Sequence, residues 1–417
     1  MSADVYRLQE LIYNDEGSFL ENANAMGSNT YASSNRIPFL GEAVASLVQE
    51  RIDDGTTQER KNASRAGYPG LRSGTLEFSC YIPGVDGGAG VPTATWFHTL
   101  LGDGLGGKLS ADDGGTITSA TDGDTFVTTA VTAITPGSII FVGVKADGRA
   151  DGQPGAVSTW SAGSTQLLTA LPGTPASPDV VRTGLHQYPT ETNPATTKRF
   201  LWMCKTSGAV FQMLGCQLEQ VTFEIPIADG GPIKATLRYQ CAVWDQVAAS
   251  SPASLPSGFT MPACDTAVIA GGSLFKNTVG TATRAIVQCS SLTLSLAMGL
   301  IAERGPTASQ HPYTNVCGWV SNGCVPTLTY TQPFLSTEKA DFDADGSSTT
   351  HKHFLFNANA TGGRRFAFYI RKAYPVGNRP TVTNMNGLVH QTVSYRGTDS
   401  DVTTSELTRS AITFVQA

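Results

Sequence analysis

The chain has 417 residues, enough for two domains with separate hydrophobic cores, because single cores stop growing at roughly 250 to 300 residues. Its formal net charge is -6, and Lys and Arg are mixed among Asp and Glu without a basic run, which excludes a protein that grips nucleic acid through its phosphates. The 44 Gly and 22 Pro residues, with only 15% charged residues, are typical of many strands joined by tight turns and predict an all-β fold.

The N-terminal ten residues lack the basic-then-apolar pattern of a signal peptide, and no apolar run approaches the roughly 18 residues of a membrane span. We therefore expect a soluble chain, without membrane insertion, that starts in a reducing cytoplasm. The eight cysteines form no C-x-x-C pair and no Cys/His cluster at zinc spacing, which favours buried free thiols. They are Cys80, Cys204, Cys216, Cys241, Cys264, Cys289, Cys317 and Cys324.

The first elements along the chain differ in clarity. Apolar residues in the segment 43–52 recur at helical spacing, although a short strand over 46–52 is an alternative. From 74 to 82 apolar and polar residues alternate, which predicts a strand with one apolar face, and Pro83 and Gly84 end it.

A short amphipathic helix is predicted over residues 92–101. Thr93 or Thr95 can cap its N-terminus, apolar residues follow at helical spacing, and Gly102 is expected to stop it. Residues 103–197 are rich in Gly, Asp, Thr, Ser and Pro, and they contain strand-like pieces at 126–134, 138–144 and 164–171. We interpret them as a β-rich insertion.

The densest strand signal lies between residues 199 and 242. Four strands are expected there, at 199–204, 211–214, 217–227 and 233–242, and Asp229, Gly230 and Gly231 form a hairpin turn between the last two. The following Ala-, Ser- and Pro-rich segment has the composition of an extended linker. We therefore predict a first domain at 1–248, a linker at 249–264 and a second domain at 265–417.

The second half of the chain contains alternating strand patterns like those of the first half. Strands are expected at 286–296, 327–330, 365–372 and 388–395, and the alternation SLTLSL at 291–296 is like that of the strand at Gly74. The strongest correspondence joins GGPIKATLRY at 230–239 to NGLVHQTVSY at 386–395, because each is a Gly turn followed by an alternating strand that ends in Tyr. These likenesses indicate a weak internal duplication.

One motif suggests a nucleotide site but lacks its context. The segment GDGLGG at 102–107 satisfies G-x-G-x-x-G and is followed by Lys108, yet Leu109 stands where a phosphate loop needs a Ser or Thr hydroxyl for magnesium. A phosphate loop also joins a strand to the start of a helix, whereas here the helix precedes the glycines. We expect no bound nucleotide or other cofactor.

A second motif suggests a calcium loop. Asp341, Asp343 and Asp345 alternate before a Gly, but the twelfth position is Lys352 instead of the bidentate Glu. A solvated acidic turn is the favoured interpretation, and cation binding there is left open. His351 and His353 share a strand face without an evident third ligand, so no metal site is predicted.

Catalytic signatures are also missing from the sequence. There is no nucleophile elbow, zinc-protease helix or Cys nucleophile pattern, and the histidines are scattered. Carboxylate pairs that could serve a glycan-cleaving enzyme, Asp341 with Asp343 or Glu219 with Glu224, are explained equally by solvation. We therefore predict that the protein is not an enzyme. The histidines are His98, His186, His311, His351, His353 and His390.

Three segments together carry a resemblance to a known family. They read NASRAGYPGLRSGTLEFSCYI at 62–82, VPTATWFHTLL at 91–101 and GCQLEQVTFEIPIADGGPIKATLRY at 215–239. They are similar to the loop and first strand, the flanking helix and the hairpin of the tail tube proteins (major tail proteins) of long-tailed, non-contractile bacteriophages. The chain most resembles a subgroup in which one polypeptide carries two copies of the tube fold.

The resemblance implies two tandem β-sandwich or barrel domains, each with a short flanking helix, with the insertion in the first. It implies a structural virion protein that stacks as rings into the tail tube, assembled in the bacterial host cytoplasm and located in the virion tail. Its partners would be further copies of itself, in homotrimeric pseudo-hexameric or hexameric rings, and other tail proteins at the tube ends. Genomic DNA would pass through the lumen without specific binding.

The trimeric ring is favoured over the hexamer because two tube domains per chain would give it pseudo-sixfold symmetry. The residues that face the lumen and the role of the insertion are open at this level. The alternative function is a binding protein of the tail tip, a capsid decoration or an adhesin, with the insertion as its recognition surface.

Overall fold

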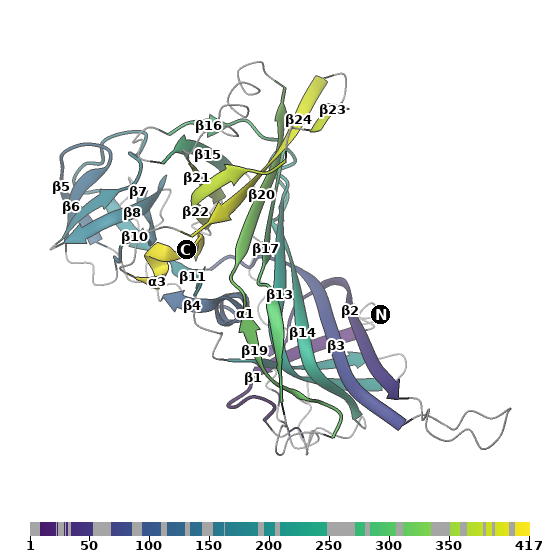
Figure 1. Cartoon of the computed structure of the whole chain (residues 1–417). Coiled ribbons are helices and arrows are strands. Elements are labelled where there is room, and N and C mark those ends of the chain that lie inside the picture. The colour runs from purple at the N-terminus through teal and green to yellow at the C-terminus, as the bar shows by residue number, and fades with distance from the viewer. Residues whose placement is uncertain are drawn as a thin grey trace, which may run out of the picture.

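The computed structural model describes residues 9–21, 23, 29, 31, 35–52, 68–85, 94–109, 115–129, 134–143, 153–161, 163–190, 196–204, 209–247, 272–279, 284–305, 312–334, 351–358, 365–377, 381–385, 388–399 and 405–417. Within them the chain is almost entirely β-structure, as the composition predicts (Figure 1). The helices are α1 (Trp96–Leu105) and α3 (Glu406–Arg409).

The strands of the N-terminal half are β1 (Gln9–Asp15), β2 (Leu40–Ile52), β3 (Tyr68–Tyr81), β4 (Gly106–Leu109), β5 (Gly115–Ala120), β6 (Thr125–Thr128), β7 (Ile139–Gly143), β8 (Gln153–Ser161), β9 (Ser164–Leu167), β10 (Val180–Thr183), β11 (Leu185–Pro189), β12 (Lys198–Cys204), β13 (Ala209–Ile225) and β14 (Lys234–Val247). Those of the C-terminal half are β15 (Gly272–Thr278), β16 (Ile286–Val287), β17 (Ser291–Ala297), β18 (Leu300–Arg304), β19 (Val316–Ser321), β20 (Val325–Pro333), β21 (Lys352–Ala358), β22 (Phe366–Pro375), β23 (Thr381–Met385), β24 (Leu388–Thr398) and β25 (Ile412–Gln416).

The same order of strand pairing occurs twice in the large 17-stranded sheet. The N-terminal ladder runs β1, β12, β13, β14, β3, β2, and the C-terminal ladder runs β15, β21, β22, β24, β20, β17. In both ladders, the spatial order of the six strands is related to their order along the chain in the same way. The two ladders are joined where the second half of β13 pairs with β17, so the halves share one continuous sheet.

Two aromatic clusters occupy equivalent places in these ladders. Phe78 of β3 stacks on Tyr239 of β14 with ring centroids 6.2 Å apart, and Phe200 of β12 meets Tyr239 edge-on at 4.9 Å. In the C-terminal ladder Tyr330 of β20 stacks on Tyr395 of β24 at 6.1 Å, and Phe354 of β21 meets Tyr395 edge-on at 4.9 Å. The sequence correspondence that aligned Tyr239 with Tyr395 therefore falls on equivalent positions.

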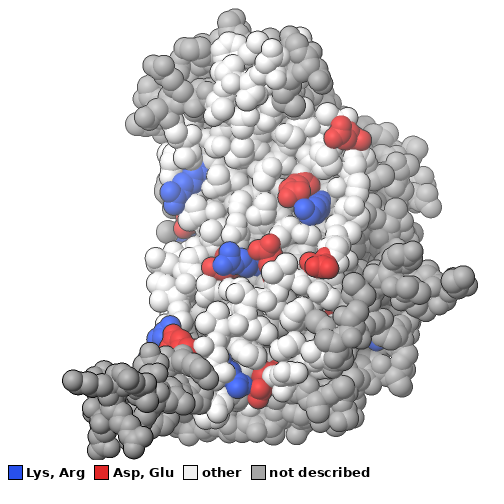
Figure 2. Space-filling model, turned by 90° about the vertical axis from the view of Figure 1, so that its right-hand side faces the viewer, with Lys and Arg blue, Asp and Glu red and all other residues white. Residues whose placement is uncertain are grey.

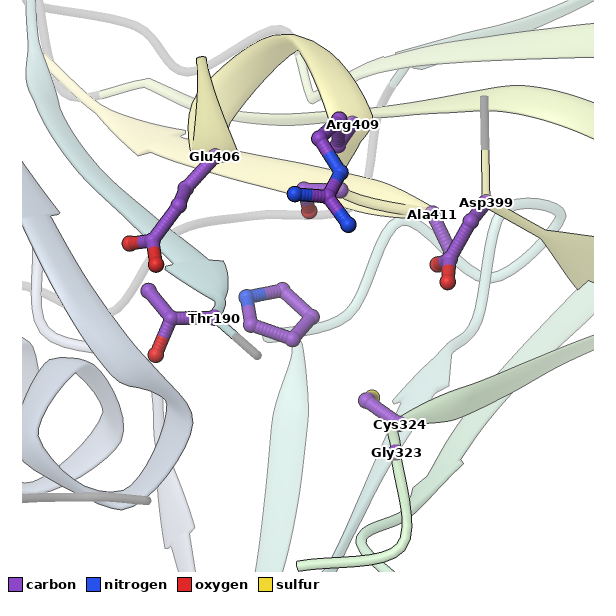
Figure 3. Close-up of a pocket in the computed structure, with 9 residues that line it drawn as sticks. Thr190, Gly323, Cys324, Asp399, Glu406, Arg409 and Ala411 are labelled. Atoms are coloured by element: carbon purple, nitrogen blue, oxygen red, sulfur yellow. The ribbon is translucent and has the colours of Figure 1, made fainter. Parts of the chain in front are cut away.

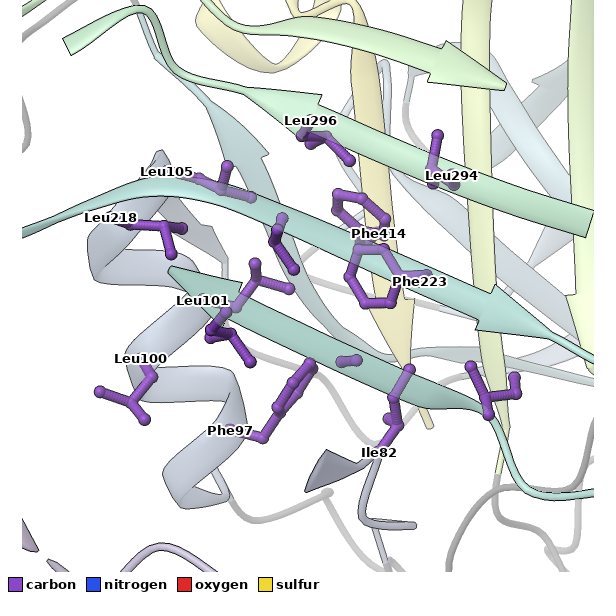
Figure 4. Close-up of a cluster of buried hydrophobic side chains, with 14 of the residues drawn as sticks. Ile82, Phe97, Leu100, Leu101, Leu105, Leu218, Phe223, Leu294, Leu296 and Phe414 are labelled. Carbon is purple, nitrogen blue, oxygen red and sulfur yellow. The ribbon is translucent and has the colours of Figure 1, made fainter. Parts of the chain in front are cut away.

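The main hydrophobic core lies between the long strands and a back layer formed by shorter strands and α1 (Figure 4). Phe223 on β13 contacts Phe97 of α1, with ring centroids 6.5 Å apart, and Phe414 of β25 at 5.1 Å. Leu294 and Leu296 of β17 complete this part of the core, so residues from both halves of the chain share it. Burial of these large side chains is the dominant stabilisation, at roughly 1.5 to 3 kcal/mol each.

Helix α1 begins after Thr95, one of the two expected caps, and both begins and ends later than the predicted range 92–101. Thr95 caps it by accepting a hydrogen bond from the His98 backbone N–H at 3.2 Å, as the sequence predicts. The predicted stop at Gly102 is wrong, because Gly102 and Gly104 lie within the helix, and Gly106, with φ of 95°, ends it. A Cβ on Gly104 would lie 2.6 Å from Leu218 Cδ2, so the glycines let the helix lie close against β13.

The predicted insertion contains a closed six-stranded barrel, in the order β10, β5, β6, β9, β8, β7, with its own hydrophobic core. Its flanking strands β4 and β11 pair with each other and return to the main sheet. The two halves of the chain share the large sheet, and the barrel lies on the side opposite the long strands (Figure 1).

Polar and apolar contacts together attach the barrel. Ile139 and Phe141 of β7 pack against Leu355 and Tyr369 of the back layer. Buried Arg371 of β22 donates hydrogen bonds of 2.7 Å to the Gly137 and Leu407 carbonyls, which joins the barrel to the C-terminal segment.

Other sequence predictions have mixed outcomes. The segment 43–52 is part of strand β2, so the strand alternative is correct and the helical spacing was misleading. The hairpin at residues 229–231 is confirmed, with Gly230 at φ of 61°. The strand at 291–296 is β17, which occupies the place of β2 in its ladder and not the place of the strand at Gly74. The linker at 249–264 lies outside the described residues.

The close approach at Gly104 yields a testable expectation. Gly104→Ala should lower the free energy of unfolding by about 1 to 2 kcal/mol, because overpacking against Leu218 outweighs the better helix propensity of Ala. Urea denaturation followed by circular dichroism measures it. Gly173→Ala is the matched control, since a Cβ there meets no atom within 4 Å. Equal stability of the two variants would contradict the packing argument.

Candidate functional surface

A continuous antiparallel ribbon of eight strands, in the order β2, β3, β14, β13, β17, β20, β24, β23, forms the side of the molecule away from the barrel. Four of its strands come from each half of the chain. Alternate residues of each strand point into the main core, and the others form what we call the open face. This continuous face of eight strands is the candidate functional surface.

Hydroxyl groups dominate the open face. Ser and Thr residues from neighbouring strands lie opposite one another and contact across the ladders, which fixes their side chains and occupies much of their hydrogen-bonding capacity. The pairs are Ser79–Thr236 at 2.8 Å, Thr222–Ser295 at 3.3 Å, Thr329–Ser394 at 2.9 Å and Thr331–Thr392 at 3.0 Å. The open face is thus polar and largely uncharged.

The few charged residues of the open face are mostly adjacent to opposite charges, as Figure 2 shows from that side. Arg238 lies opposite Glu77 in register, and its Nε is 2.8 Å from Glu219 Oε2. Lys234 Nζ is 3.3 Å from Glu224 Oε2. Glu219 and Glu224, considered as a catalytic pair from the sequence, are thus bound to basic partners on neighbouring strands.

The ribbon has an unpaired edge at each end. In the described part of the chain, β2 pairs only with β3, and β23 pairs only with β24. Apolar side chains are exposed at both edges: Val44 and Val48 on β2 are 61% and 51% exposed, and Val382 on β23 is 52% exposed. Long apolar edges are templates for pairing with another chain.

The nucleotide-like motif has no anion cradle in the structure. Lys108, the residue that would reach a phosphate, is ion-paired with Asp103, which also binds Lys198. Lys198 is almost fully buried and reaches Asp15 as well. These residues form an ion-pair network that joins α1 to β1, β4 and β12.

The candidate metal ligands do not converge in the described residues, where no group of three His, Cys, Asp or Glu could hold an ion. Asp341, Asp343 and Asp345 lie outside the described residues. His353 is buried, whereas its neighbour on the same face, His351, is half-buried.

The free thiols are more varied than expected. Cys80, Cys216 and Cys241 are buried, the last two with sulfur atoms 2.7 Å apart across β13 and β14, but Cys317 is exposed. Nothing is described for the side chains of Cys204 and Cys264.

A small pocket lies between α3, the end of β11 and the turn before β20 (Figure 3). Glu406, Arg409, Asp399 and Cys324 line it. Burial, and then the nearby Asp399 carboxylate, raise the pKa of Cys324, so its thiol keeps its proton at neutral pH and is no activated nucleophile. No helix in the described residues is long and apolar enough to cross a membrane.

Several buried titratable groups are structural. Burial lowers the pKa of His98, His186 and His353 to about 4, so they are neutral at physiological pH. His186 joins β11 to the barrel, with its Nε2 2.9 Å from both backbone N and O of Ile139. Because these histidines bind protons more readily in the unfolded chain than in the folded chain, the free energy of unfolding decreases as the pH falls from about 6.5 toward 4.

Buried Glu16 supports the bend in β13. Its Oε1 accepts a hydrogen bond of 2.9 Å from the backbone N–H of Gly215, which has φ of 59°, and Trp319 Nε1 donates to the Gly215 carbonyl at 2.7 Å. Burial raises the pKa of Glu16 to about 7, against the smaller opposing effect of the Thr197 hydroxyl.

Comparison with known proteins gives no assignment: no protein-family model and no curated protein matches the chain.

The Glu16 carboxyl sets a pH dependence. Because its folded pKa exceeds the unfolded value of 4.5, its stabilisation is complete below 4.5 and is lost as pH rises through about 7. Glu16→Gln, which resembles the protonated form, should raise the free energy of unfolding at pH 8 by on the order of 2 kcal/mol and change it little at pH 4.5. Urea titrations at the two pH values measure this.

Glu16→Asp, which keeps an ionisable group, is the control and should retain the loss of stability above neutral pH. A gain from Glu16→Gln that is the same at both pH values would contradict the assignment.

Proposed function

We propose that this chain is a structural virion protein that polymerises as stacked rings into the tail tube of a long-tailed bacteriophage. The observation that carries the proposal is the ribbon: a continuous sheet with a hydroxyl-lined open face and an unpaired edge at each end. Copies joined along these edges close the sheet into a wide barrel around a lumen, which removes the exposed edges.

The doubled ladder supports two tandem tube domains in one chain. Each half of the chain contributes four strands to the ribbon, and the two aromatic clusters repeat with nearly the same ring distances. Three chains then place six similar units around the axis, which favours a trimeric ring with pseudo-sixfold symmetry.

The open face suits a surface past which DNA slides. Tight binding to phosphate needs basic side chains that release counterions, but Lys234 and Arg238 are paired with glutamates and the hydroxyls are paired with one another. A lumen lined in this way offers DNA little net attraction. Genomic DNA is thus cargo of the conduit and not a specifically bound partner.

The barrel gives the second candidate function, a binding protein of the tail tip, a decoration or an adhesin. It is a closed unit with its own core, and it projects on the side opposite the ribbon, where it would be displayed on the outside of a tube. A binding protein of this kind would form capped units of fixed size instead of long polymers.

Electron microscopy of the purified chain tests the proposal, together with light scattering over a concentration series. We expect stacked rings or hollow tubes of uniform width, with threefold symmetry in end-on views. Particles of fixed size without a lumen at every concentration would contradict the tube and support the binding protein.

A further inference from the structure

The chain contains, in the β13–β17 ladder, an internal joint between its two similar halves. Thr222 lies opposite Ser295, Phe223 opposite Leu294, and Glu224 opposite Thr293. Phe223 and Leu294, paired in this joint, are both fully buried in the main core. The inference that follows rests on the proposed function, in which copies associate into a ring. In such a ring, the strand pairing between copies can repeat the pairing of β13 with β17 within the chain.

Strand β23 occupies the place of the second half of β13. Thr381 lies opposite Thr392, three residues before Tyr395 of β24, and Thr222 lies opposite Thr236, three residues before Tyr239 of β14. Since the two tyrosines are equivalent, Thr381 corresponds to Thr222. By the same count Val382 corresponds to Phe223 and Thr383 to Glu224.

Strand β2 occupies the place of β17. Leu294 lies opposite Leu328, two residues before Tyr330 of β20, and Ala45 lies opposite Leu76, two residues before Phe78 of β3. Ala45 therefore corresponds to Leu294. Its neighbours Val44 and Ser46 correspond to Thr293 and Ser295.

The burial of these positions indicates what is missing. Phe223, which has β17 beside it and Phe97 and Phe414 packed on it, is fully buried, whereas Val382, on the equivalent face of β23, is 52% exposed where no strand of the described residues lies beside it. Val44 on β2 is 61% exposed. A strand laid along each edge would reduce the exposure of both residues and pair backbone groups of the edge strands.

We propose that β23 of one copy pairs antiparallel with β2 of the next, with Thr381 opposite Ser46, Val382 opposite Ala45 and Thr383 opposite Val44. The register places the Thr381 and Ser46 hydroxyls together, as Thr222 and Ser295 are within the chain at 3.3 Å. Two different edges meet, so the contact is heterologous and each copy offers one edge to each neighbour. The partner is thus a second copy of this chain.

Cysteine cross-linking tests the register. The double variant Ser46→Cys, Thr381→Cys is oxidised with copper phenanthroline at concentrations where the parent assembles, and its products are separated without reductant. We expect covalent dimers and trimers at least tenfold above the parent chain, which shows the background from native cysteines such as Cys317.

Two matched variants accompany this pair. Glu50→Cys, Thr381→Cys moves one thiol four residues along β2, roughly 13 Å away, and should stay at background. Thr222→Cys, Ser295→Cys is the equivalent pair within one chain. Its two introduced thiols should form a disulfide within the chain, so that they are lost without the formation of covalent oligomers. If this internal pair reacts while Ser46→Cys, Thr381→Cys does not exceed the shifted pair, the proposed register is overturned.

Charge at the edge gives a second measurement. Val382→Lys should reduce the assembled fraction in sedimentation at least tenfold with an unchanged circular dichroism spectrum, whereas Val127→Lys, on an exposed barrel valine, should not. Normal assembly of Val382→Lys would count against the joint. Hollow tubes without the expected cross-link would leave the tube function standing and remove this register. Covalent closed rings that never stack would support this register and contradict the tube function.

Discussion

The ladder between β13 and β17 is the constraint on which the rest of the architecture depends. It makes one sheet of two ladders that could otherwise be separate units. To do so, β13 pairs with β12 along its first half and with β17 along its second, and it changes partner near a register shift between Leu218 and Gln220. Gly215, shortly before this shift, has a positive φ, and both of its backbone polar groups are bound by side chains.

Much of the fold follows from local pattern in the sequence. Alternation located the strands at β3, β14 and β24, and it separated β13 into two predicted pieces at the position where Gly215 bends it. The aligned tyrosines reflect a real packing requirement, since each fills the centre of an aromatic cluster. Alternation alone, however, cannot distinguish one strand from another, so the segment 291–296 was matched to β3 although it occupies the place of β2.

The errors have physical causes that local pattern does not contain. Gly102 was interpreted as the end of a helix because Gly destabilises helices, but Gly102 and Gly104 lie within it and leave room for the Lys108 and Leu218 side chains. The open face also could not be predicted from local sequence pattern. Ser and Thr at alternate positions of β17 and β20 were visible, but only the strand order shows that their hydroxyls meet across the ladders. That order depends on contacts between residues far apart in the chain.

The way the barrel is attached has a consequence for how such a protein can diversify. The chain leaves the main sheet along β4 and re-enters along β11, and these strands are paired, with Leu109 opposite His186. Exit and return therefore lie side by side, and the sheet is complete on both sides of the gap. A module of another size or shape can occupy this position without any change in strand order elsewhere. The barrel can then change in size or sequence while the main sheet keeps its strand order.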